Sequence, residues 1–136
     1  MTIFLDASAI VAMIAREPEA ETFGRYLGIE TDRITSPLAI WESVRGVESA
    51  RGVTLQEARA LVADFVTEGS IRVVTLDAED ADLALDAHAR FGKGVHPAAL
   101  NFGDCFAYAS TRRHGAELMF KGNDFAQTDI PDATLP

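Results

Sequence analysis

Residues 100–109 read LNFGDCFAYA, and residues 120–125 read FKGNDF. The first segment predicts the start of a helix, because Asn101 is a favoured N-cap residue and apolar side chains recur after it. The second segment continues an apolar stretch that predicts a strand. Each carries one carboxylate, Asp104 early in the helix and Asp124 just after the strand. In α/β proteins, ligands gather beyond the carboxyl ends of the strands.

The rest of the chain repeats this alternation of strands and helices. Strands are expected at 2–5, 33–35, 71–74 and 117–120, and helices at 9–15, 18–28, 37–51, 55–68, 78–91 and 102–114. We expect Ser8 to cap the first helix and Pro18 to occupy the first position of the second. This order favours an α/β fold with a mostly parallel sheet covered by helices.

The composition is typical of one globular domain. The chain has 136 residues, of which 48% are hydrophobic and 24% charged, so we expect a single domain over residues 1–136. One cysteine excludes an internal disulfide and fits a reducing cytoplasm. The N-terminus lacks a basic leader and no apolar run is long enough to span a bilayer, so we expect a cytoplasmic protein without a membrane partner.

The net charge of −9 counts against nucleic-acid binding, which usually needs a basic surface. The objection is limited, because bound cations would partly neutralise a group of acids, and a local basic rim can coexist with a negative total. The basic candidates for such a rim are Arg45, Arg51, Lys93, Arg112, Arg113 and Lys121. A solvated surface charge is the more common role for any one of them.

Four carboxylates lie at the ends of predicted elements: Asp6, Glu42, Asp104 and Asp124. Each has an ordinary alternative role. Asp6 and Asp104 could cap helices, Glu42 could pair with Arg45, and Asp124 could serve in a turn. Asp129, further along the chain, is a candidate fifth acid.

Gathering these carboxylates in one place would raise their pKa values, so a fold that does so needs a cation. Oxygen-only ligands favour Mg²⁺ or Mn²⁺ over zinc. Such ions activate water for phosphodiester hydrolysis. Other chemistry is less well supported: the three histidines show no metal-binding spacing, Cys105 lies among apolar residues, and no nucleophile elbow or phosphate-binding glycine loop is present.

Other functions remain open on these residues. An aspartyl-phosphate phosphohydrolase usually has a second aspartate two positions after the first, where this chain has Ser8. A phosphate-accepting receiver domain would need an acidic pair at the first strand, which Asp6 alone does not supply. A catalytically weak interaction module would bind a partner through helix faces, but it has no need of four clustered acids.

Four features together resemble the PIN-domain family of metal-dependent ribonucleases, and within it the VapC-type toxins of bacterial type II toxin–antitoxin systems. They are FLDASAI at residues 4–10, Glu42 in the helix after Ser36-Pro37, HPAALNFGDCFAYA at residues 96–109, and FKGNDF at residues 120–125. The resemblance covers nearly the whole chain. Ala7 departs from it, since relatives often have a hydroxyl residue there, which affects only a secondary contact.

The resemblance implies a three-layer α/β/α fold with four to five strands in the central sheet. It implies that Asp6, Glu42, Asp104 and Asp124 are the metal-binding and catalytic residues. Ser8 and Asn123 are implied as polar supporting residues, beside the candidate fifth acid Asp129. It further implies endonucleolytic cleavage of RNA with Mg²⁺ or Mn²⁺, a homodimer, and inhibition by a VapB-type antitoxin in a hetero-oligomeric complex.

Overall fold

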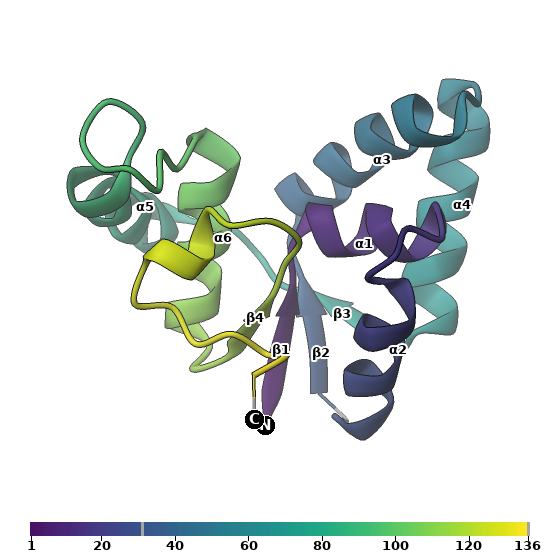
Figure 1. The fold of residues 1–136 in the computed structure, drawn as a ribbon, viewed down its shortest axis with the longest axis horizontal. Coiled ribbons are helices and arrows are strands. Elements are labelled where there is room, and N and C mark those ends of the chain that lie inside the picture. Colours follow the sequence, from purple (N-terminus) through teal and green to yellow (C-terminus); the bar gives the residue numbers. More distant parts are fainter. Residues whose placement is uncertain (31, 136) are drawn as a thin grey trace.

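A parallel sheet lies between two groups of helices in the computed structural model, which describes residues 1–30 and 32–135 (Figure 1). The strands are β1 (Thr2–Leu5), β2 (Asp32–Thr35), β3 (Ile71–Val73) and β4 (Glu117–Met119), in the order β3-β2-β1-β4. All three strand pairs are parallel. An isolated parallel bridge joins Leu118 to Asp132 beside β4. The prediction of an α/β fold with a parallel sheet is confirmed.

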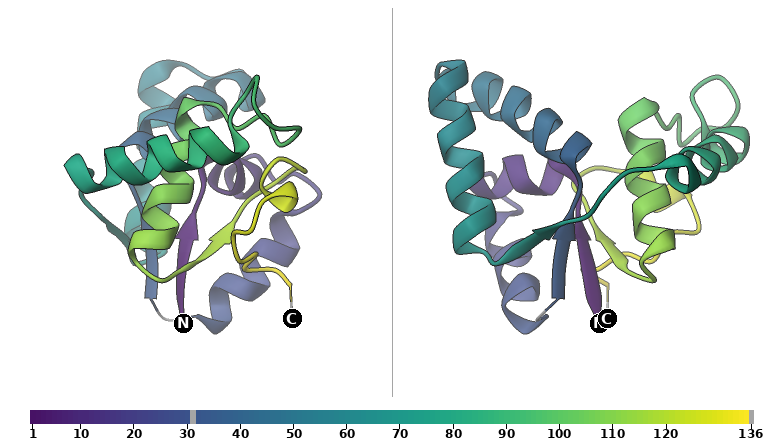
Figure 2. Two further views of the ribbon diagram at one scale, coloured as in Figure 1. Left: turned by 90° about the vertical axis from the view of Figure 1, so that its left-hand side faces the viewer. Right: turned by 180° about the vertical axis from the view of Figure 1, so that it is seen from behind.

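The helices divide between the two faces of the sheet. One face carries α1 (Ala7–Ile14), α2 (Ala20–Ile29), α3 (Pro37–Arg51) and α4 (Leu55–Glu68), and the other carries α5 (Ala78–Phe91) and α6 (Phe102–Arg113). The view from behind shows the same two groups on either side of the strands, with α3 and α4 as a projecting hairpin (Figure 2). A short 3₁₀ helix, η1 (Phe125–Gln127), follows β4.

The two faces of the central strand β1 supply two separate parts of the core. Phe4 packs in a cluster with side chains of α5 and α6, whereas Ile3 and Leu5 pack in a cluster with α1 and α2. Alternate residues of a strand point to opposite faces, so one buried strand serves both layers. A third apolar cluster around Val47 and Val62 joins α3 to α4. Among the described residues, no helix is both long and apolar enough to cross a membrane.

Two predicted helix starts are wrong. The first helix begins at Ala7, and its N-cap is Asp6, whose side chain accepts a hydrogen bond from the backbone N–H of Ser8. Ser8 therefore lies inside the helix and does not cap it. The second helix begins at Ala20 after an uncapped Glu19, so Pro18 precedes it in a turn. In both places the local signal was present, and the boundary was misplaced by two residues.

Three helices begin at the same edge of the sheet, because α1 follows β1, α3 follows β2, and α6 leads back into the parallel strand β4. Ser36 caps α3 by accepting a hydrogen bond from Ala39 N–H at 3.1 Å, with Pro37 in the first turn. Asn101 caps α6. The expected caps of these two helices are confirmed, and they direct both helix N-termini to the carboxyl edge of the sheet.

A candidate active site at the carboxyl edge of the sheet

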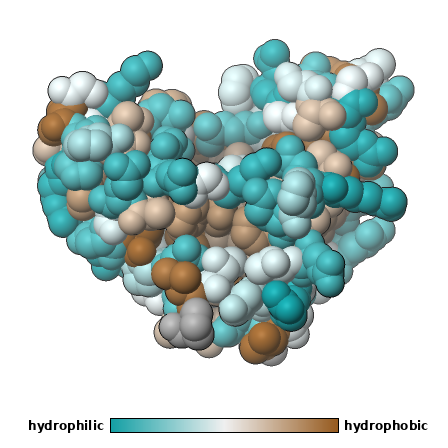
Figure 3. Space-filling view, viewed as in Figure 1, coloured by the Kyte–Doolittle hydropathy of each residue, from teal (hydrophilic) through white to brown (hydrophobic). Residues whose placement is uncertain are grey.

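A cavity of about 360 Å³ lies where α1, α3 and the N-terminus of α6 meet. It is lined by Asp6, Ala7, Ser8, Val11, Glu17, Glu42, Gly46, Asp104 and Lys121. Figure 3 shows the surface hollowed between the two helical layers at the upper edge of the molecule. Three of the four predicted acids, from separate parts of the chain, therefore share one cavity.

Asp6 is the most buried of these acids, with 6% of its surface exposed. Its Oδ2 accepts hydrogen bonds from the Ser8 N–H at 3.1 Å and the Ser8 hydroxyl at 2.5 Å. Ser8 Oγ in turn accepts from the backbone N–H of Lys121 at 3.0 Å. Burial raises the pKa of Asp6 above its usual value, and the hydrogen bonds from Ser8 only partly oppose this shift. Ser8 thus orients the carboxylate and ties α1 to the segment after β4.

Glu42 reaches from α3 across to the first turn of α6. A Cβ atom built on Gly103 would come within 2.1 Å of Glu42 Oε2, so only glycine leaves room for the carboxylate there. Partial burial and the nearby negative charges of Asp6 and Asp104 raise the pKa of Glu42 to about 7. The raised pKa means that the ionised form of Glu42 is unfavourable here unless a proton or a cation neutralises its charge.

Asp104 both caps α6 and faces the cavity. Its Oδ2 accepts from Asn101 N–H at 3.0 Å, while Asn101 Oδ1 accepts from Asp104 N–H at 2.9 Å. Burial, together with the charges of Asp6 and Asp124, raises the pKa of Asp104 to about 6, against the lowering effect of the Asn101 hydrogen bond. The capping role and the proposed ligand role therefore coexist in one carboxylate.

Asp124 is exposed at the start of η1 and does not line the cavity, but its charge is near enough to raise the pKa of Asp104. Asn123 is also exposed, and it lines a neighbouring pocket of about 520 Å³ with Lys121 and Asp132. Its backbone carbonyl accepts from Gln127 Nε2 at 3.3 Å. The structure thus brings Asp124 to the rim of the acidic group and leaves the Asn123 side chain outside the cavity.

Asp129 lies in a different cluster, so the structure does not support its predicted place as a fifth acid. Its carboxylate accepts from the Tyr108 hydroxyl at 2.5 Å and pairs with Arg90 and Arg112, each at 2.9 Å. Despite an opposing effect of burial, the hydrogen bonds from Tyr108, Arg90 and Arg112 lower the pKa of Asp129 to about 2. This carboxylate holds the C-terminal segment against α5 and α6.

The acidic group has the ligand chemistry of a hard divalent cation, although the side chains do not form a closed site. Within residues 1–30 and 32–135, no three acidic, histidine or cysteine side chains stand close enough together to hold a metal ion unaided. All the donors are carboxylate oxygens, and their raised pKa values reflect burial and mutual repulsion that a cation would offset. Mg²⁺ suits such an open arrangement, since it usually keeps several water ligands.

Two features of the cavity are not predicted from the sequence. Glu17, in the turn between α1 and α2, lines it, and its Oε1 pairs with Lys121 Nζ at 3.2 Å. Gly103 makes room for Glu42. A glycine in the first turn of a helix is intrinsically unfavourable and often indicates a close approach, so Gly103 offered a usable signal. The position of Glu17 depends on the turn between α1 and α2, and no motif predicts it.

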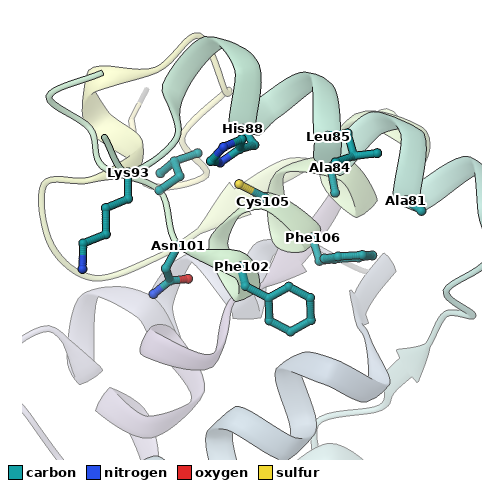
Figure 4. A pocket seen from close by; sticks show the side chains of 10 residues that line it. Ala81, Ala84, Leu85, His88, Lys93, Asn101, Phe102, Cys105 and Phe106 are labelled. Carbon is teal, nitrogen blue, oxygen red and sulfur yellow. The ribbon is translucent and has the colours of Figure 1, made fainter. Parts of the chain in front are cut away.

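Another cavity lies elsewhere in the molecule. It has a volume of about 650 Å³ and lies between α5 and α6, where Leu85, Phe102, Cys105 and Phe106 give it an apolar lining (Figure 4). Cys105 is buried in its wall, as expected for a packed thiol. No carboxylate lines this cavity, so it lacks the groups for metal-assisted hydrolysis.

Known proteins of one family are similar to this chain in sequence and in fold. The family model described as "PIN domain" matches residues 3–131. VapC ribonuclease R02377 of Rhizobium meliloti is 41% identical, covering 93% of this chain and 98% of the relative. Ribonuclease VapC30 of Mycobacterium tuberculosis is 36% identical, covering 97% and 98%. The crystal structure of Mycobacterium tuberculosis VapC20, a Sarcin-Ricin loop cleaving toxin, superposes with a TM-score of 0.74 over 94% of this chain and 95% of that one; at 20% identity this likeness concerns the fold.

Proposed function

The chain belongs to the PIN domain family, and from this membership we propose that it is a VapC-type endoribonuclease toxin that hydrolyses RNA phosphodiester bonds. The similar relatives are ribonucleases by name and align over nearly their full length. The structural observation that carries the proposal is the cavity where Asp6, Glu42 and Asp104 lie together with raised pKa values.

Asp6, Glu42, Asp104 and Asp124 are the proposed metal ligands and catalytic residues, for Mg²⁺ or Mn²⁺. When bound, such a cation lowers the pKa of a coordinated water and stabilises charge on the leaving oxygen. The chain itself supplies the orientation. Ser8 fixes the Asp6 carboxylate, Asn101 fixes Asp104, and Gly103 admits Glu42, which would be a ligand or position the attacking water.

The proposed partners are an RNA substrate, a VapB-type antitoxin and a second copy of the chain. These follow from family membership, since the similar relatives are VapC proteins. The proposed location is the cytoplasm, where the RNA substrate occurs.

The aspartyl-phosphate phosphohydrolase is less well supported by the geometry. Its second acid would stand at Ser8, and the hydroxyl there is already hydrogen-bonded to Asp6 and to Lys121 N–H. A non-catalytic interaction module is also less well supported, because binding a partner does not require acids placed so close together that the pKa values of Glu42 and Asp104 rise.

The direct test is cleavage of total cellular RNA by the purified protein, free of any partner, with Mg²⁺, with Mn²⁺ or with EDTA. The Asp104→Asn variant is assayed beside it, because asparagine keeps an oxygen that can accept from Asn101 N–H. Asp86→Asn on the exposed face of α5 controls for the loss of one negative charge.

Discrete fragments that require metal and disappear only in Asp104→Asn would support the proposal. If the wild-type protein neither cleaves RNA nor gains thermal stability from Mn²⁺, the nuclease assignment is wrong.

A further inference from the structure

The only tryptophan of the chain is exposed next to the acidic cavity. Trp41 lies on α3 with 62% of its surface accessible, and it directly precedes Glu42. A large aromatic side chain left in solvent forgoes the burial that usually stabilises such residues. Because Trp41 is next to a proposed catalytic residue, its exposed ring is available to contact a bound ligand.

Two arginine side chains line the same groove as this tryptophan. The guanidinium of Arg45 lies 5.8 Å from the centre of the Trp41 ring, within the range of a cation–π contact. Arg45 also pairs with Glu48, through Nε at 2.9 Å, and its side chain is 62% exposed. Arg59 contributes from the neighbouring helix α4, and within residues 1–30 and 32–135 it has no ion-pair partner.

These side chains line a groove of about 410 Å³ between α3 and α4. Its lining residues are Pro37, Ile40, Trp41, Val44, Arg45, Leu55 and Arg59. The groove combines an apolar floor with two arginines, of which Arg45 is paired with Glu48, and no acid lines it, in a chain whose net charge is −9. Its arginines are opposite in sign to the net charge of the chain and suit an anionic ligand.

Trp41 and Arg45 form the edge of the groove that lies nearer the acidic cavity, because the other groove residues of this helix, such as Ile40 and Val44, point further away from Glu42. Successive helical residues are about 100° apart around the axis, so Arg45 projects from a direction between those of Trp41 and Glu42. Glu42 lines the cavity, whereas Trp41 and Arg45 line the groove. A chain molecule with a phosphate at the acids could extend along α3 toward the tryptophan.

Single-stranded RNA matches this combination of features. Proteins hold it by stacking bases on aromatic rings and arginine planes and by pairing arginines with phosphates. We propose that Trp41, Arg45 and Arg59 form a subsite for single-stranded RNA, in which a base near the cleaved bond stacks on Trp41 and the arginines contact adjacent phosphates. The inference rests on the proposed ribonuclease function and adds a substrate-binding surface to it.

The single tryptophan makes the subsite directly observable, because all indole emission comes from Trp41. The experiment uses the non-cleaving Asp104→Asn protein and titrates it with oligouridylate and oligoadenylate of equal length. Indole emission and the anisotropy of end-labelled RNA are recorded together. We expect RNA binding to quench the emission, and both signals to weaken with rising salt.

Variants of the groove residues are then compared in the same non-cleaving background. Trp41→Ala should weaken RNA binding on the order of tenfold to one hundredfold, and Trp41→Phe should restore most of the loss because a ring remains for stacking. Arg45→Gln and Arg59→Gln should weaken binding and reduce its salt dependence. Leu85→Ala, which removes an equally exposed apolar side chain from α5, is the matched control and should leave binding unchanged.

The outcomes separate this inference from the proposed function. Suppose that the wild-type protein cleaves RNA, but RNA does not change the Trp41 emission and Trp41→Ala does not weaken RNA binding. The proposed subsite is then wrong, while the nuclease function stands. The groove would then fit a protein partner better. If the protein neither binds nor cleaves RNA, both proposals fail.

Discussion

The carboxylate of Glu42 lies directly against Gly103, where a Cβ atom would come within 2.1 Å of Glu42 Oε2. This contact joins α3, from one helical layer, to the first turn of α6, from the other. It also places Glu42 beside Asp104, which directly follows Gly103 in α6. The absence of a side chain at Gly103 is thus what allows the two layers to bring their acids together.

Gly103→Ala should reduce RNA cleavage by about tenfold or more while leaving the fold intact. The overlapping atoms belong to the far end of a flexible side chain, so Glu42 can rotate away at little cost to folding, and alanine favours the helix. The measurement is the cleavage rate against Mn²⁺ concentration beside thermal unfolding. Gly24→Ala is the control, since its Cβ would meet nothing within 4 Å. Full activity in Gly103→Ala would show that Glu42 needs no fixed position.

Asp6→Asn should abolish cleavage without lowering stability, whereas Asp6→Ala should abolish cleavage and also lower stability. Asparagine is a good N-cap and can still accept from Ser8 N–H, so only the charge is lost. Alanine also removes the cap of α1, which costs about 1 kcal/mol. Urea unfolding of the metal-free variants separates the two effects. Equal stability of the two variants would exclude a capping role for Asp6.

The metal-free protein should lose stability as the pH rises from about 5 to about 8. Glu42 has a pKa of about 7 in the folded chain against 4.5 for the free group, and Asp104 about 6 against 3.8. Both groups hold their protons more tightly when folded. The stability they contribute is therefore complete below the unfolded pKa and is lost as the pH passes through 6 and 7. After allowance for solvent screening, the loss is roughly 1–2 kcal/mol.

Urea midpoints in EDTA measure this pH dependence, and Glu42→Gln should reduce it because glutamine does not titrate. Mg²⁺ or Mn²⁺ should restore stability at the higher pH, since a cation favours ionised carboxylates. A metal-free protein that becomes more stable over this pH interval would contradict the proposed crowding of the acids.

The sequence predicted the acidic group better than its surroundings. Asp6 and Asp104 could be assigned because a strand end and a helix cap are local patterns, and parallel strands bring such ends to one edge. Asp129 was expected beside these acids, whereas the structure pairs it with Arg90 and Arg112, which come from two helices whose packing no local pattern records. Glu17 was missed for the same reason. Local signals locate ends of elements, whereas side-chain pairing depends on tertiary packing.

Asp129→Asn should loosen the C-terminal segment without removing any proposed catalytic group. The variant loses the charge that holds Arg90 and Arg112, at a cost of roughly 1 kcal/mol because all three groups are partly exposed. Hydrogen exchange should accelerate at residues 125–133, and the cleavage rate at saturating metal should fall less than tenfold. Asp64→Asn, an exposed acid of α4, is the control. Unchanged exchange would show that the cluster does not fix this segment.

Gly46→Ala should act on stability, in contrast to Gly103→Ala. A Cβ on Gly46 would come within 2.6 Å of Val11 Cγ2, where α3 crosses α1 beside the cavity. Valine is short and stiff, so the helices themselves must shift, at a cost of about 1–3 kcal/mol that outweighs the better helix propensity of alanine.

Val11→Ala should relieve the overlap, and the double variant should be more stable than the sum of the single changes predicts, by about 1 kcal/mol. Urea unfolding of the four proteins in this cycle gives the coupling free energy directly. Strict additivity would mean that α1 and α3 do not pack against each other at this point. In that case, a difference in stability between Gly46→Ala and Gly103→Ala could not be explained by the stiffness of Val11 compared with the flexibility of Glu42.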